Sequence, residues 1–239
     1  MTEVVAERSG TTLTLTLDRP GKMNALSGAM VDTLLAQLRE AGIDGTRLVV
    51  FRGKGKNFSA GFDFTGFEEQ SEGDLLLRFT RVEQLLQAVY HAPFDTLVLA
   101  HGKNVGAGVD LVGVCAHRVA SAEATFRMPG LRFGLVLGSR RFARQVGAER
   151  AQPILQEAKT FGAEEALRIG FLTAVSTQDQ WEGAIAGAVA ASNALPAATA
   201  ARLFEVIRTD TRDADLAELV RSAAAPGIKD RIAAYLGNR

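Results

Sequence analysis

The sequence has one cysteine, Cys115, which excludes an internal disulfide and a cysteine-based metal cage. No apolar run approaches the ~20 residues that a membrane span requires. The first ten residues contain acidic side chains and no long apolar segment, so we expect no signal peptide. These absences lead us to expect a cytoplasmic protein with no membrane partner and no metal site.

An excess of charge of either sign is also missing. Lys+Arg and Asp+Glu number 27 each, so the formal net charge is zero. A balanced chain has no general attraction for nucleic acid, and we expect none as a partner. Apolar residues, by contrast, make up 47% of the 239 residues, enough for the core of one large domain.

The first half of the chain alternates between strand and helix patterns. Leu13, Leu15 and Leu17 alternate with threonines, which is the period of a half-buried strand. The alternation predicts an α/β fold with crossover helices. The expected elements are strands at 4–7, 11–17, 48–51 and 96–99, a helix at 28–41 capped by Ser27, and a helix at 74–90.

Helical patterns dominate after Gly138. We therefore predict an α/β core at 1–177 and a helical oligomerisation region at 178–239. Apolar residues recur at helical spacing in the second region: Leu195, Leu203, Phe204, Val206, Ile207, Leu216, Leu219 and Val220.

A glycine-rich segment follows the strand at 96–99. Gly102, Gly106 and Gly108 precede Asp110, where an apolar helix begins. Free backbone N–H groups and the helix dipole meet at such a point and favour negative charge. A dinucleotide-binding turn, a turn that only permits tight packing, and an oxyanion hole are the alternatives. Nearly 100 preceding residues and the absence of a Tyr-x-x-x-Lys pair disfavour the first, and the third requires a second donor.

Five segments carry recognisable motifs in order along the chain: Arg19-Pro20 with Asn24-Ala25-Leu26, Phe58–Asp63, His101–Leu111, Gly162–Gly170 and Ile232–Leu236. They resemble motifs of the crotonase superfamily, the enoyl-CoA hydratases and isomerases, at consistent spacing. The resemblance implies a spiral of βαβ units with two near-perpendicular sheets and a helical trimerisation region. It also implies an acyl-CoA substrate, no separate cofactor, and a homotrimer or hexamer.

The resemblance assigns the oxyanion hole to the backbone N–H groups of Phe62 and Ala107. It further implies contacts with coenzyme A or substrate at Lys22, Ala25, Ala60, Asp63, Phe64, Gly106, Pro129 and Gly130. For Lys22 the alternative is an ordinary surface lysine. Arg132, Arg140 and Arg141 could bind an acidic acyl group or phosphates, but we favour a solvated helix face for them.

The catalytic positions depart from the family pattern. Of the two glutamates of the hydratases, the first falls at Asp110 and the second at Gly130. Acids that other members use near Gly138 are also absent. Asp110 is therefore the one acid–base group that we predict, with a helix cap as the alternative. We expect isomerisation, decarboxylation or thioester cleavage rather than two-glutamate hydration; the alternative is a catalytically silent acyl-CoA-binding or scaffold member.

Overall fold

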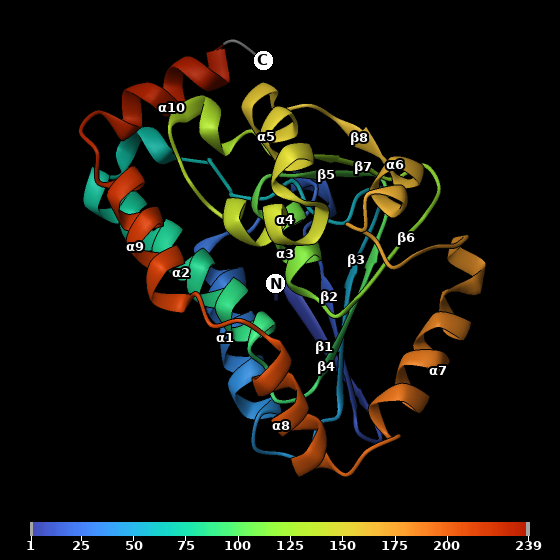
Figure 1. Ribbon diagram of the computed structural model, residues 1–239. Helices are drawn as coiled ribbons and strands as arrows, with labels where there is room; N and C mark the ends of the chain where they lie inside the picture. Colours follow the sequence, from blue (N-terminus) through green and yellow to red (C-terminus); the bar gives the residue numbers. More distant parts are fainter. Residues whose placement is uncertain (1, 238–239) are drawn as a thin grey trace.

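The computed structural model describes residues 2–237 and contains two β-sheets, with helices on both faces of the larger one (Figure 1). The larger sheet has the order β1-β2-β3-β4-β6-β9, and the smaller has the order β5-β7-β8. The β1–β2 and β7–β8 pairs are antiparallel, and all other pairs are parallel. The strands are β1 Val4–Ser9, β2 Thr12–Leu17, β3 Leu48–Gly53, β4 Asp95–Ala100, β5 Lys103–Val105, β6 His117–Ala120, β7 Thr125–Arg127, β8 Phe161–Gly162 and β9 Ala174–Val175.

Helices connect these strands and form most of the C-terminal third. They are α1 Gly28–Ala41, α2 Glu72–Tyr90, α3 Ala107–Val114, α4 Ser139–Val146, α5 Ala148–Glu157, α6 Ala163–Arg168, α7 Trp181–Ser192, α8 Ala197–Ile207, α9 Arg212–Ala223 and α10 Ile228–Gly237. Short 3-10 turns occur at η1 Pro20–Lys22, η2 Phe67–Glu69, η3 Gly130–Phe133 and η4 Gln178–Gln180. The predicted α/β fold with a helical C-terminal part is confirmed.

The central strands are buried on both faces, which explains their continuous apolar sequence. Val49 and Phe51 of β3 join the main core beneath α1 and α2, whereas Leu48 and Val50 pack toward Trp181 of α7. Successive side chains of a strand point to opposite faces, so one short apolar run supplies both cores. Figure 1 shows α1 and α2 on one side of the sheet and α7 on the other.

The predicted helix starts are correct for α1 and two residues late for α2. The Ser27 side chain accepts a hydrogen bond from the Met30 N–H at 3.0 Å and caps α1 as expected. Asp74, predicted as the start of a helix, lies at its third residue and forms a capping box with Ser71.

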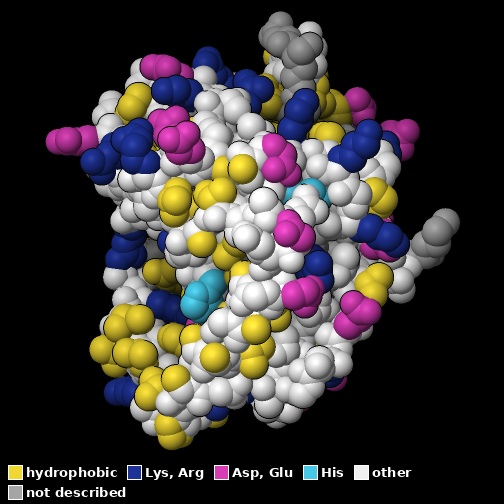
Figure 2. All heavy atoms as spheres, turned by 90° about the vertical axis from the view of Figure 1, so that its right-hand side faces the viewer, with side chains coloured by type: hydrophobic (Ala, Val, Ile, Leu, Met, Phe, Trp, Pro, Cys, Tyr) yellow, Lys and Arg dark blue, Asp and Glu magenta, His cyan; other side chains and the backbone are white. Residues whose placement is uncertain are grey.

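The C-terminal helices pack partly on the α/β core. α9 lies against α2 and α10 against η3, and the division at residue 177 stays a prediction. α8 exposes Val206 and Ile207, which are 70% and 64% accessible. Figure 2 shows apolar side chains on the lower part of the face that α7 and α8 share. Within residues 2–237 no single helix has the length and apolarity of a membrane span; Gln178–Ser192 and Ala197–Ile207 reach them only as a pair bent by 97°.

Candidate active site

Two loops meet backbone to backbone at the N-terminus of α3. Gly61 has φ +78°, and a Cβ atom there would lie 2.2 Å from the Val105 carbonyl oxygen and 2.9 Å from the Ala107 nitrogen. A Cβ at Gly108 would lie 2.5 Å from the Ser59 carbonyl oxygen. Glycine at both positions is what lets the loops approach so closely. The contact brings the turn before Phe62 against the first residues of α3.

The N–H groups of Phe62 and Ala107 have no hydrogen-bond acceptor among residues 2–237. Ala107 is the first residue of α3, where an N–H lacks an intrahelical partner. Both residues line the same cavity. Among the described residues, the cavity wall therefore has two backbone N–H donors without a hydrogen-bond acceptor, and one of them lies at the positive end of a helix dipole.

The rest of the cavity wall is largely apolar and aromatic. The Phe62 ring stacks on Phe79 of α2, with centroids 4.2 Å apart, so the Phe62 side chain forms wall while its N–H remains available. Phe64, Phe133 and Tyr235 continue the wall, with ring centroids 5.8 Å and 5.2 Å apart. The other lining residues are Ala60, Val105, Gly106, Asp110, Met128, Pro129, Gly130, Leu131, Leu135, Leu137, Ser139 and Leu155.

Asp110 is the one carboxyl group that lines this cavity in the described chain. Asp110 is 7% exposed, and no donor among residues 2–237 forms a hydrogen bond with its carboxyl oxygens. The N-cap of α3 is Gly106, so the Asp110 side chain does not cap the helix. A Cβ at Gly138, which has φ +65°, would lie 1.8 Å from Oδ1 of Asp110. The glycine thus makes room for the carboxyl group.

Burial raises the pKa of Asp110 well above its ordinary value. The positive charge of Arg141 opposes this effect and the negative charge of Glu83 reinforces it. A carboxyl group in such surroundings keeps its proton at higher pH than an exposed aspartate does. Asp110 is therefore suited to donate a proton from the wall of the cavity.

Arg141 is buried, contrary to the solvated helix face that we expected for it. Its Nη1 and Nη2 atoms donate to Glu83 at 2.9 Å and 2.5 Å, and Nη1 also donates to Asp215 at 3.0 Å. Arg140 is half exposed and pairs with Asp215 at 2.7 Å. Arg132 is also exposed, and its Nη2 donates to the Glu157 carbonyl oxygen at 2.8 Å. Paired arginines are not available to an acidic substrate.

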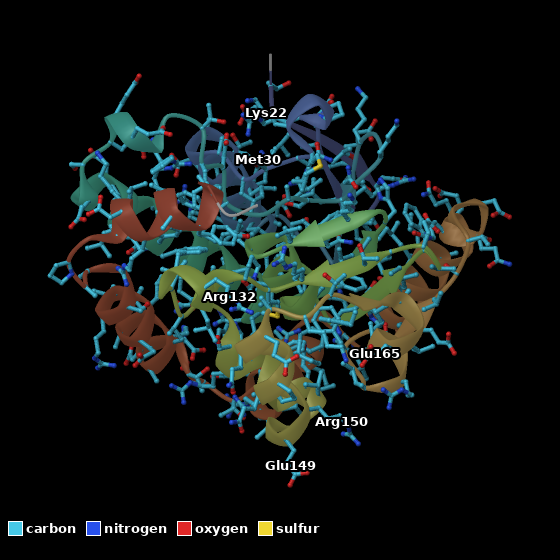
Figure 3. All side chains as sticks on the ribbon, turned by 90° about the horizontal axis from the view of Figure 1, so that it is seen from above. Lys22, Met30, Arg132, Glu149, Arg150 and Glu165 are labelled. Carbon is cyan, nitrogen blue, oxygen red and sulfur yellow. The ribbon has the colours of Figure 1, made fainter. Side chains whose placement is uncertain are left out.

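Three of the expected contact residues lie outside the cavity lining. Lys22 is exposed on η1, and Figure 3 shows it well apart from Arg132 on η3. Ala25 is buried, and its carbonyl oxygen accepts from Arg19 at 2.7 Å. Asp63 forms an ion pair with Arg19 at 2.8 Å. Burial alone would raise the pKa of Asp63, but hydrogen bonds from Thr65 and Arg19 outweigh it and lower the pKa. The remaining five, Ala60, Phe64, Gly106, Pro129 and Gly130, line the cavity.

Sequence reasoning missed Glu83 as a neighbour of the site. Glu83 is 1% exposed and lies four residues after Phe79 on the buried face of α2. An acidic residue on the apolar face of an amphipathic helix was the available signal. Tyr235 of α10 also lines the cavity, 80 residues beyond Leu155, the nearest other wall residue along the chain; it belongs to the terminal motif at 232–236.

The described residues contain no cluster of three or more His, Cys, Asp or Glu side chains that could hold a metal ion. His101 is buried, and its Nε2 atom lies 2.9 Å from the Gly55 carbonyl oxygen. The cavity lining combines the two backbone N–H donors with the Asp110 carboxyl group and the side chains of Ser139 and Tyr235.

Comparison with known proteins agrees with this fold. The enoyl-CoA hydratase/isomerase family model matches residues 7–224. A solved structure from Bordetella parapertussis, named for the same family, has a TM-score of 0.98 and 53% identity over 99% of each chain. "Probable enoyl-CoA hydratase echA6" of Mycobacterium bovis is 32% identical over 69% of this chain and 67% of its own length. The "2,3-dehydroadipyl-CoA hydratase" of Escherichia coli is 30% identical over 75% of this chain and 71% of its own length.

The two sheets, the C-terminal helices and the loop pair before α3 define a protein of the crotonase fold. The family match covers most of the described chain. The protein belongs to the enoyl-CoA hydratase/isomerase family.

Proposed function

We propose that the protein is an acyl-CoA enzyme that stabilises a thioester enolate with two backbone N–H groups and protonates it with one acid, Asp110. The observation that carries the proposal is a single buried carboxyl group in the same cavity as the unclaimed N–H groups of Phe62 and Ala107. A thioester oxygen that gains negative charge is the ligand such donors favour. Each donor of this kind lowers the activation barrier by roughly 3–4 kcal/mol.

Decarboxylation of a β-carboxyacyl thioester fits these groups best. The bond between the α-carbon and the carboxylate breaks, CO2 leaves, and the electron pair passes into the enolate, whose oxygen the Phe62 and Ala107 N–H groups bind. Asp110 then gives its proton to the α-carbon and recovers one from water. No base is required for the first step, so the raised pKa of Asp110 favours this reaction. Isomerisation and thioester cleavage require Asp110 to begin as a base.

Two-carboxylate hydration lacks its second acid. The position of the second glutamate is Gly130, where a Cβ would lie 3.0 Å from the Leu135 carbonyl oxygen. The space beside Gly138 holds the Asp110 carboxyl group itself. Neither glycine can transfer a proton.

A panel of thioesters tests the proposal: malonyl-CoA and methylmalonyl-CoA as β-carboxyacyl substrates, crotonyl-CoA for hydration, and butyryl-CoA as a saturated ligand. We expect CO2 release from a β-carboxyacyl-CoA, with deuterium at the α-carbon when the reaction runs in D2O. Asp110→Asn should bind the same thioesters, measured by calorimetry, and lose the turnover. Asp32→Asn is the matched control, because Asp32 pairs with Arg81 at the surface and does not line the cavity.

Two results contradict the proposal in different ways. Turnover of crotonyl-CoA at the rate of an ordinary hydratase would show that Gly130 has been misread. Binding without turnover of any thioester, by the wild type and by Asp110→Asn alike, would establish the catalytically silent acyl-CoA binder instead.

We also propose a trimer or a dimer of trimers. Leu195, Leu203, Val206 and Ile207 are 39–70% exposed on and beside α8, an arrangement that supports association through this helix. Leu219, which we had placed in the same group, is fully buried within the monomer on α9 and cannot contribute. Light scattering that reports a 25.5 kDa species at micromolar concentration would contradict this assembly.

A further inference from the structure

A second, smaller pocket adjoins the main cavity and shares Asp110 and Met128 with it. It is lined by Asp110 and Val109 of α3, by Gly138, and by Arg141 and Gln145 of α4, with Gly113, Met128, Phe142 and Phe171 completing the wall. Asp110 and Arg141 are the two ionisable side chains that line this pocket, and the charge of Arg141 acts on the Asp110 carboxyl group. In the main cavity, the one other titratable lining residue is Tyr235.

An unopposed arginine at this position would ionise Asp110. Opposite charge within a few ångströms lowers the pKa of a carboxyl group, typically by about one to three units. Arg141 is 7% exposed, so water screens its charge little. The pKa of Asp110 is nevertheless raised, because burial outweighs the charge of Arg141 and the negative charge of Glu83 opposes that charge.

Glu83 of α2 forms a buried ion pair with Arg141. Its two carboxylate oxygens accept from Nη1 and Nη2 of Arg141 at 2.9 Å and 2.5 Å, a two-point ion pair with both side chains buried. Gln87 donates to Glu83 at 2.9 Å and holds it in place. Asp215 of α9 accepts from Nη1 at 3.0 Å, and Arg140 in turn pairs with Asp215. The Nε atom of Arg141 has no partner among residues 2–237, and it is the remaining donor that could turn to Asp110.

We propose that Glu83 is a positioning residue for Asp110. By binding both terminal nitrogens of Arg141, Glu83 reduces the effect of the Arg141 charge on Asp110, so that Asp110 keeps its proton and can donate it. The importance of Glu83 for turnover rests on the proposed role of Asp110. The charged groups that face Asp110 are Arg141 from α4 and Glu83 from α2, with Asp215 and Arg140 behind Arg141. The pair Glu83–Arg141 has no net charge. Removing the Glu83 carboxylate alone leaves the positive charge of Arg141 unbalanced near Asp110.

The titration of Asp110 measures this directly and requires no substrate. Protein labelled with 13C at the aspartate carboxyl carbons is titrated by NMR, and Asp110→Asn identifies the resonance. We expect Glu83→Gln to raise the acid-dissociation constant of Asp110 at least about tenfold, a shift of about one pH unit toward acid. The double variant Glu83→Gln with Arg141→Met removes both charges and should return the midpoint close to that of the wild type. Asp32→Asn removes one surface negative charge and is the matched control that should not shift it.

An unchanged midpoint in Glu83→Gln would overturn the proposal. So would an equal shift in the single and double variants, because Arg141 would then not be the mediator. If amide spectra show that Glu83→Gln does not fold, Asp215→Asn replaces it; it also frees part of Arg141 and should shift the midpoint in the same direction by a smaller amount. No shift there would overturn the proposal as well. Loss of turnover in Asp110→Asn without these shifts would refute the role of Glu83 alone, and these shifts without loss of turnover would refute the proposed function alone.

Discussion

Replacing Gly61 by alanine should separate the two loops that meet before α3. Gly61 has φ +78°, and its Cβ would lie 2.2 Å from the Val105 carbonyl oxygen, more than 1 Å inside the 3.4 Å of ordinary contact. Gly66 offers a matched control. It has φ +69°, similar to that of Gly61, but nothing lies within 4 Å of its Cβ position. Both variants place an alanine in the left-handed region and lose the corresponding conformational free energy. Only Gly61→Ala adds a steric clash with the Val105 and Ala107 backbone.

The magnitudes follow from these two terms. An L-residue in the left-handed region costs roughly 1–2 kcal/mol, and Gly66→Ala should lose about that much free energy of unfolding. Overpacking against fixed backbone adds typically about 1–3 kcal/mol, so Gly61→Ala should lose about 2–5 kcal/mol. Since the Val105 and Ala107 backbone must move to admit the methyl group, the spacing of the Phe62 and Ala107 N–H groups should change too.

Urea denaturation followed by circular dichroism measures the difference at one protein concentration, which must be fixed because association would shift the midpoint. Calorimetry with butyryl-CoA measures whether the separated loops still bind a thioester. Gly66→Ala should bind as the wild type does and Gly61→Ala should bind at least about tenfold more weakly. Equal stability losses in the two variants would refute the close contact of the loops.

Three further outcomes follow from buried ionisable groups. Asp110→Asn should stabilise the protein near pH 8 and have little effect near pH 4. The pKa of Asp110 is higher in the folded state than in the unfolded state, so the stability of the wild type falls as pH rises from the ordinary pKa through the folded-state pKa. Thermal melts that show equal shifts at both pH values would contradict this. Asp63→Asn should do the reverse, destabilising at neutral pH with a difference that disappears as pH falls through the lowered pKa of Asp63, and urea midpoints from pH 7 down to pH 3 check it. Burial raises the pKa of the Cys115 thiol to about 12, so it should react with a disulfide reagent at pH 8 only in urea; rapid reaction of the native protein would show that the site opens.

Local chemistry was enough to predict the strands β1 to β4, the helices α1 and α2 and several of their ends. The alternating leucines of β2, the continuous apolar runs of β3 and β4, and the cap at Ser27 each depend on neighbours within a few residues. The glycine turn predicted a helix from Asp110, and α3 begins three residues earlier, at Ala107. Short-range periodicity and capping leave their signal in the sequence because the groups that interact are close along the chain.

The raised pKa of Asp110 and the burial of Arg141 were decided by the tertiary structure alone. Arg141 follows Gly138 on a helix whose sequence reads as polar, and only the packing of α2 and α9 against it brings Glu83 and Asp215 to its guanidinium group. Glu83, Asp110 and Arg141 are separated by about 30 residues each along the chain, so no local pattern could show that they meet. A pKa depends on burial and on charges across space, and these are properties of the folded chain rather than of any segment of it.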